Sequence, residues 1–240
     1  MAEQNDTNER TDRWTAVDHY TFNHLHANKP SATPSPSSLQ HALSTSQARG
    51  LPDIAVSPSQ GKFLKLQAQI ARAKNILEIG TLGGYSTIWL ASAGPDVSVV
   101  SIEVSEKHAE IARANIAHAE YAERVDVVVG AGLDVLPRLV EEVGMGRRER
   151  FDFLFVDADK ENNWAYVDLS LGMMRRGAVV VVDNVVRKGQ LARDDTGDSR
   201  VEGVRKLIES VGMDDRLDGV VLQTVGEKSY DGFLMAIVNS

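Results

Sequence analysis

Residues 76–86, which read ILEIGTLGGYS, decide the fold. The run begins as an apolar strand, passes through Gly80, Gly83 and Gly84, and reaches Tyr85 and Ser86, where a helix is expected to start. In doubly wound sheets, ligands bind beyond the carboxyl ends of the strands, where glycines let the backbone approach them closely. The run therefore predicts a first strand beside a ligand site, although the glycines alone fit a tight turn equally well.

Short apolar runs alternate with helical patterns after this stretch, which indicates βα units stacked into a parallel sheet. Strands are expected at 76–79, 97–104, 125–129, 151–156, 178–182, 219–225 and 231–238, and helices near 85–93, 106–123, 133–143, 163–174 and 201–211. No helix separates the last two strands. The prediction is an α/β fold: a doubly wound Rossmann-like sheet of seven strands with a terminal antiparallel β-hairpin, preceded by N-terminal helices.

The N-terminal part is predicted to hold a tail and three helices. Residues 1–13 are polar without periodicity, so we expect a disordered tail. Helices are expected over 14–28 and 39–48, on either side of a Pro- and Ser-rich loop, and a third opens at Ser57 with Gln60 completing a capping box. Residues 14–240 are expected to form one domain, with 14–50 as a helical cap and 55–240 as the catalytic core.

Two carboxylates suggest which ligand the glycine loop holds. Glu103 closes the second strand about 20 residues after Gly80, near the spacing at which an acidic side chain meets ribose hydroxyls. Glu78 lies within an apolar strand, where it needs a partner such as the cationic amino group of a methionine-derived cofactor. A nicotinamide-dependent oxidoreductase is the alternative, but its fingerprint needs a glycine where this chain has Leu82.

Oxygen-bearing side chains follow two further strands. Asp157 comes directly after the fourth strand, and Asp183 and Asn184 follow the fifth. Three oxygen donors at one edge of a sheet suit a hard cation such as Mg²⁺ and disfavour zinc. Each residue singly is as readily explained as a cap of the following helix or turn.

The chain resembles the cation-dependent O-methyltransferases, the group that includes the caffeoyl-CoA and catechol O-methyltransferases. The resemblance covers residues 55–240 and rests on VSPSQGKFL, ILEIGTLGGYSTIWLA, FDFLFVDADKENNWAY and VVVVDNVVRKG, which occur in the family's order and spacing. It implies an S-adenosylmethionine cofactor, a divalent cation such as Mg²⁺, a phenolic or catechol-like small-molecule substrate and a homodimer. Cofactor-binding residues are expected at Ser57, Glu78, Gly80, Ser86, Glu103 and Gly132, and metal ligands at Asp157, Asp183 and Asn184.

The resemblance also assigns catalytic roles to Asp157 and Lys160. The matching lysine of catechol-type enzymes takes the proton of the hydroxyl that is methylated, although a lysine between Asp159 and Glu161 is also typical of a solvated ion pair. Asp159 is expected to cap the helix or to touch the cofactor. Lys188, within DNVVRKG, stands where the plant coenzyme A-ester enzymes have a substrate-contacting Asn, so substrate identity does not carry over.

Composition excludes several other functions. The formal net charge is −8 and no basic stretch is long enough to follow a phosphate backbone, so no nucleic-acid partner is expected. The absence of cysteine excludes disulfides and thiolate metal sites. With no apolar run long enough to span a bilayer and no secretory signal, we expect no membrane partner and a cytoplasmic location. The histidines near the N-terminus (His19, His24, His26, His41) lack metal-binding spacing and are expected to be solvated or on helix faces, and His108 to be exposed.

Overall fold

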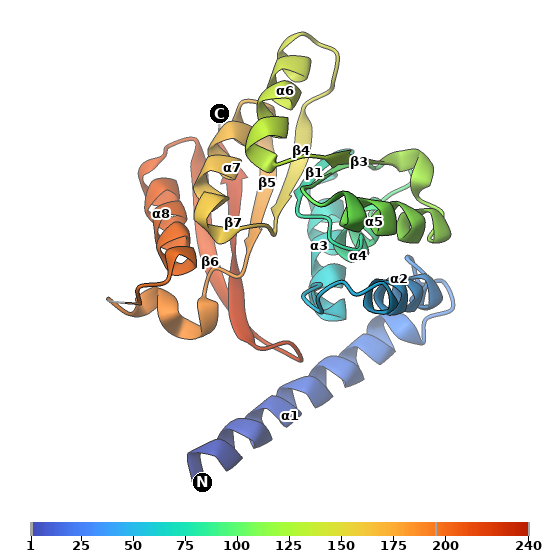
Figure 1. The fold of residues 1–240 in the computed structure, drawn as a ribbon, viewed down its shortest axis with the longest axis vertical. Helices are drawn as coiled ribbons and strands as arrows, with labels where there is room; N and C mark the ends of the chain where they lie inside the picture. Colours follow the sequence, from blue (N-terminus) through green and yellow to red (C-terminus); the bar gives the residue numbers. More distant parts are fainter. Residues whose placement is uncertain (1, 195, 240) are drawn as a thin grey trace.

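The computed structural model describes residues 2–194 and 196–239, and side-chain burial from residue 12 onward. Its centre is one seven-stranded sheet in the order β3-β2-β1-β4-β5-β7-β6 (Figure 1). The strands are β1 (Asn75–Ile79), β2 (Ser98–Glu103), β3 (Val125–Val129), β4 (Phe151–Val156), β5 (Met174–Asp183), β6 (Leu217–Val225) and β7 (Tyr230–Val238). The predicted seven-stranded Rossmann-like sheet is therefore confirmed.

The strand order reverses at β1. Strands β1 to β5 pair in parallel, with β2 on one side of β1 and β4 on the other. Strand β7 is antiparallel to both β5 and β6, which confirms the terminal hairpin. The loops that follow β1 and β4 therefore turn away from each other. In a doubly wound sheet, the ligand crevice opens at such a point.

Helices cover both faces of the sheet because its strands alternate their apolar side chains. On β4, Phe153 and Phe155 face one helical layer, and Leu154 and Val156 face the other. The first layer contains α2 (Pro36–Ala48), α3 (Pro58–Ile70), α4 (Tyr85–Ala91) and α5 (Glu106–His118), and the second contains α6 (Gly132–Gly144), α7 (Asn163–Leu171) and α8 (Ser199–Met213). Figure 1 shows the two layers on either side of the sheet.

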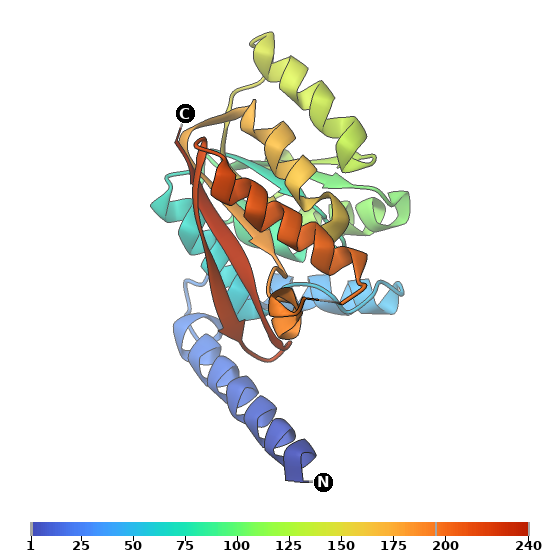
Figure 2. The same ribbon diagram turned by 90° about the vertical axis from the view of Figure 1, so that its left-hand side faces the viewer.

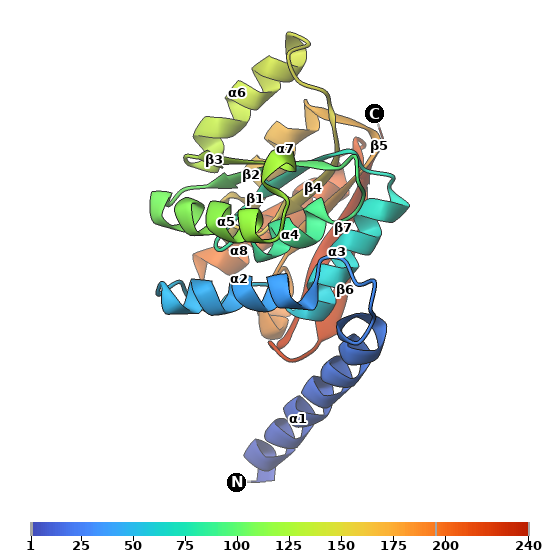
Figure 3. The ribbon, with the colours of Figure 1, turned by 90° about the vertical axis from the view of Figure 1, so that its right-hand side faces the viewer.

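The N-terminus differs from the sequence prediction. Helix α1 (Ala2–Phe22) includes residues that were expected to form a loose tail, and it continues into a π-helical turn at Asn23–Ala27. Residues 2–13 contain no Pro or Gly and include several good helix formers, so polarity alone does not prevent a helix there. Figures 2 and 3 show α1 projecting away from the body of the molecule.

His26 is a second difference, since it is fully buried and not solvated. Its ring donates to the carbonyl of Pro34 at 3.0 Å and lies 4.7 Å from the Trp89 ring. Burial, together with the nearby Lys62 ammonium, lowers the pKa of His26 to about 4. Its role is to pack the N-terminal turn against α4.

Several element boundaries also differ from the prediction, and the largest of these differences is the end of α5 at His118, where 123 was expected. Helix α7 ends at Leu171, three residues before the expected end, because the chain turns at Gly172 into a longer β5. Strand β5 begins at Met174, where it pairs with Phe151.

Within residues 2–194 and 196–239, none of the helices combines the length and apolar character that a membrane-spanning segment needs.

Asp152 joins three elements at the amino edge of the sheet. One of its carboxylate oxygens accepts the backbone N–H groups of Lys74 and Asn75 at 2.7 and 2.9 Å. The other pairs with Arg175, whose guanidinium also donates to the carbonyl of Ala71 at 2.9 Å. Because Asp152 is buried, these partners replace the water that its charge would otherwise need.

Asp152→Ala should therefore destabilise the fold by about 2–4 kcal/mol, since it leaves two N–H groups and a guanidinium without their acceptor. Urea unfolding followed by circular dichroism measures the change. The matched control is Asp126→Ala, which removes an exposed carboxylate from the same position of β3 and should change stability by less than about 0.5 kcal/mol. Equal stability of the two variants would contradict the role of Asp152.

Candidate active site

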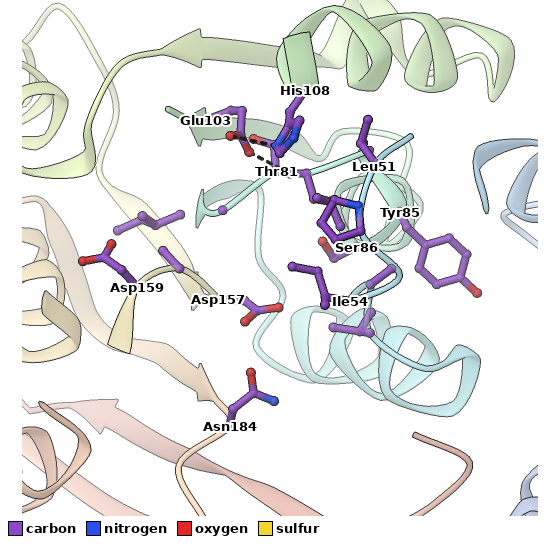
Figure 4. A pocket seen from close by; sticks show the side chains of 18 of the residues that line it. Leu51, Ile54, Thr81, Tyr85, Ser86, Glu103, His108, Asp157, Asp159 and Asn184 are labelled. Atoms are coloured by element: carbon purple, nitrogen blue, oxygen red, sulfur yellow. Dashed lines mark hydrogen bonds and ion pairs between the residues drawn. The ribbon is translucent and has the colours of Figure 1, made fainter. Parts of the chain in front are cut away.

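A cavity of about 1020 Å³ opens at the carboxyl ends of the parallel strands. Its floor is formed by the loops that follow β1 to β5, and its outer wall includes Leu51 and Ile54 from the segment between α2 and α3. Figure 4 shows Glu103 at one end, Asn184 at the other and Asp157 between them. The volume is at the upper end of the roughly 300–1000 Å³ typical of small-molecule sites.

The glycine loop after β1 lies against the neighbouring strands. Gly80 has φ +103°, and a Cβ there would collide with the carbonyl of Asp157, so only glycine fits. Leu82 adopts the left-handed conformation with φ +49°, and its N–H donates to Glu103 at 2.8 Å. The loop is therefore fixed to the ends of β2 and β4, which sets the shape of the cavity floor.

Glu103 lies at the cavity wall, as the sequence predicts for it. Its second oxygen accepts the N–H of Ser105 at 2.9 Å and lies 3.4 Å from Nδ1 of His108. His108 is half-buried and lines the cavity, so the expectation that it would be exposed was wrong. The sequence did contain a signal for this placement of His108, because the residue lies in the first turn of the helix that follows a strand ending in an acidic residue.

Glu78 differs from its predicted role because it does not line the cavity. Its fully buried carboxylate accepts from Ser86 and Ser101, each at 2.6 Å, and from Thr87. Burial raises the pKa of Glu78 to about 7, against the opposing effect of these hydroxyl donors. The partners of the Glu78 carboxylate are thus hydroxyl groups, whereas the sequence led us to expect a cationic ligand. Ser86 itself does line the cavity.

Gly132 and Asp159 meet at Tyr166 on the far side of the cavity. A Cβ on Gly132 would lie 2.6 Å from the Tyr166 ring. The Tyr166 hydroxyl donates to Asp159, and burial together with this carboxylate raises the pKa of Tyr166. Asp159 occupies the N-cap position of a 3-10 turn but makes no capping bond, and accepts instead from Asn162 and Tyr166.

Asp157 and Lys160 form an ion pair at the end of β4. Nζ of Lys160 lies 2.8 Å from the Asp157 carboxylate, and Lys160 is only 7% exposed. Helix α8 packs directly on the Lys160 backbone because Gly203 has no side chain there. Lys160 is therefore a buried residue held by two elements, and not the solvated side chain that was the competing expectation.

Asp183 and Asn184 end β5 beside Asp157. Asp183 is buried, and its carboxylate accepts the N–H of Asn184 at 2.8 Å. Asn184 has φ +57° and lines both the main cavity and a neighbouring one of about 300 Å³. Asp183 lines the smaller cavity, as does Ser57, whose Oγ caps α3 by accepting the N–H of Gln60 at 3.2 Å. Ser57 lies at the boundary of the two cavities, since Val56 and Pro58 on either side of it line the main one.

These side chains fit a hard divalent cation. Asp157 and Asp183 each follow one of two paired residues of adjacent strands, Val156 and Val182, so their carboxylates lie near each other. Burial, followed by the negative charge of Asp157, raises the pKa of Asp183. Among the described residues, no three His, Cys, Asp or Glu side chains gather as a metal cluster. A cation here would use two carboxylates and the Asn184 amide, an all-oxygen set that suits Mg²⁺.

Comparisons with known proteins identify the family of the chain. Residues 30–235 match the family model described as O-methyltransferase. The chain is 51% identical to the O-methyltransferase imqG of Aspergillus flavus over 94% of this chain and 91% of that protein. It is 50% identical to a catechol O-methyltransferase of Mycobacterium tuberculosis, over 83% and 88% of the two chains.

A solved structure extends the likeness to the whole fold. The O-methyltransferase from Bacillus cereus, crystallised in complex with SAH, superposes with a TM-score of 0.87 at 46% identity, covering 95% of this chain and 100% of that one. None of these comparisons supports the nicotinamide-dependent alternative. The chain therefore belongs to the O-methyltransferase family.

Proposed function

We propose that the chain transfers the methyl group of S-adenosylmethionine to one hydroxyl of a catechol-like small molecule, with a divalent cation as cofactor. The observation that carries the proposal is the convergence of Asp157, Asp183 and Asn184 beside the main cavity. The relative from Mycobacterium tuberculosis, a catechol O-methyltransferase, supports the acceptor class.

The main cavity would hold the methyl donor. The SAH-bound relative supports this choice of cofactor. Glu103 would accept hydrogen bonds from the ribose, with Gly80 and Gly132 allowing close approach of the ligand. Ser86 and Asp159 would contribute polar contacts from the loops after β1 and β4. Glu78 would act indirectly, since its carboxylate orients Ser86.

The reaction needs an oxygen nucleophile in line with the methyl group. Asp157, Asp183 and Asn184 would hold the cation, which when bound lowers the pKa of an acceptor hydroxyl. The hydroxyl oxygen forms a bond to the methyl carbon as the carbon–sulfur bond breaks, and the electron pair returns to the sulfonium sulfur. Lys160, held beside Asp157, is the proposed acceptor of the hydroxyl proton, for which its amine must be neutral.

We also propose a homodimer in which α1 of one copy contacts the other. Apolar side chains on α1 and the turn after it, including Val17, Tyr20 and Leu25, are 61–68% exposed. Apolar side chains gathered on one projecting helix are a common feature of contact surfaces.

The dimer proposal predicts a mass by light scattering of about twice the 26.2 kDa of the chain. Tyr20→Asp should shift the mass toward that of one chain, since it places a charge in the contact. Met213→Asp, which adds a charge at an 88% exposed apolar residue at the end of α8, is the control for added charge on an exposed residue. A wild-type mass of one chain would refute the proposal.

Asp183→Asn should lower kcat/KM for methyl transfer to catechol about 100-fold or more, because it removes a ligand charge while keeping the shape of the side chain. Affinity for S-adenosylhomocysteine, measured by calorimetry, should stay unchanged. Asp218→Asn changes an exposed carboxylate on β6 in the same way and should keep full activity. Full activity of Asp183→Asn would exclude the metal role.

Glu103→Gln should weaken S-adenosylhomocysteine binding about tenfold or more, because hydrogen bonds to a charged acceptor contribute roughly 1.5–3 kcal/mol. Calorimetric titration measures the affinity. Glu123→Gln, an exposed carboxylate just before β3, is the matched control. Equal affinities in the two variants would show that Glu103 does not contact the cofactor.

A further inference from the structure

Among the described residues, four Lys and Arg side chains line the main cavity, and three of them form ion pairs with carboxylates. The paired residues are Lys160 with Asp157 at 2.8 Å, Arg200 with Asp198 at 2.7 Å and Lys228 with Asp53 at 2.7 Å. Arg187 makes no ion pair with any described residue, although the charge of Asp198 interacts with it at longer range, and its Nε is buried without a hydrogen-bond partner. A buried guanidinium nitrogen without an acceptor is costly, which indicates that a ligand supplies one.

The backbone around Arg187 holds this side chain in place. Arg187 and Lys188 both adopt the left-handed conformation, with φ +54° and +55°, which is strained for residues other than glycine. One carboxylate oxygen of Asp231, from β7, accepts the N–H groups of Val186 and Arg187 at 3.1 and 2.9 Å. The terminal hairpin therefore fixes a strained turn that presents Arg187 to the cavity.

Arg187 lies on the acceptor side of the site. It comes three residues after Asn184, beyond the end of β5, whereas Glu103 ends β2, on the far side of β1 and β4 in the sheet order. The proposed cation site, at the ends of β4 and β5, is thus between Arg187 and Glu103. A molecule bound through the cation and extending away from the cofactor's ribose would reach Arg187.

We infer that Arg187 binds a carboxylate of the acceptor, so that the preferred acceptors are diphenols that carry a carboxylate, such as a dihydroxybenzoate. This inference rests on the proposed function. A guanidinium matches a carboxylate with two parallel hydrogen bonds, which adds orientation to affinity. The cofactor's own carboxylate offers the same chemistry, and the position of Arg187 beyond the cation site favours the acceptor as its source.

The test compares 3,4-dihydroxybenzoate with catechol as acceptors for the full-length wild type and three variants. Arg187→Gln should lower kcat/KM for 3,4-dihydroxybenzoate about tenfold or more, the effect of about 1.4 kcal/mol, and change that for catechol less than about twofold. Arg187→Lys should restore part of the preference. The matched control is Arg193→Gln, which removes an exposed cation at the end of the same 3-10 segment, outside the cavity lining, and should leave both values unchanged.

Calorimetric titration with S-adenosylhomocysteine separates the two carboxylate sources. Unchanged affinity in Arg187→Gln, with a selective loss on 3,4-dihydroxybenzoate, supports the inference. Three results for Arg187→Gln would overturn the inference: weakened affinity for S-adenosylhomocysteine, an equal loss of kcat/KM for both acceptors, or no loss for either. Methylation of catechol by the wild type would still support the proposed function. If the wild type methylates neither acceptor, the proposed function fails and the inference fails with it.

Discussion

The register of two parallel strands determines the chemistry of this site. Val156 of β4 pairs with Val182 of β5, so the next residue of each strand, Asp157 and Asp183, leaves the sheet at the same edge. Two carboxylates held together by a buried sheet repel each other unless positive charge compensates them. Lys160 supplies part of that charge from its own ion pair with Asp157. The proposed cation would supply the rest, and the donor and acceptor pockets are arranged around it.

Strong periodic patterns made the fold predictable from the sequence. The apolar runs of β1 and β4 are buried on both faces, so their composition alone identified them as inner strands. Asp157, Asp183 and Asn184 were also predictable, because parallel strands that follow each other in the sheet must end at one edge. Ser57 as a helix cap followed from a local rule that needs no tertiary information.

Other features depend on contacts between distant segments. Glu78 receives hydroxyls from α4 and β2, so its partners could not be read from the sequence around it. The placement of Arg187 at the cavity depends on Asp231, far along the chain, which accepts a backbone N–H of the turn that carries Arg187. The part of α1 before residue 14 was missed because residues 2–13 lack an apolar pattern, and helix propensity is a weak signal by itself.

The central claim is methyl transfer to oxygen that depends on a divalent cation. The most direct measurement incubates the wild-type protein with methyl-labelled S-adenosylmethionine and catechol, then repeats the reaction after EDTA treatment and after Mg²⁺ is added back. We expect a labelled methyl group on a catechol oxygen, loss of product with EDTA and recovery with Mg²⁺. Unchanged product formation after EDTA, or no labelled methyl ether with Mg²⁺ present, would contradict it.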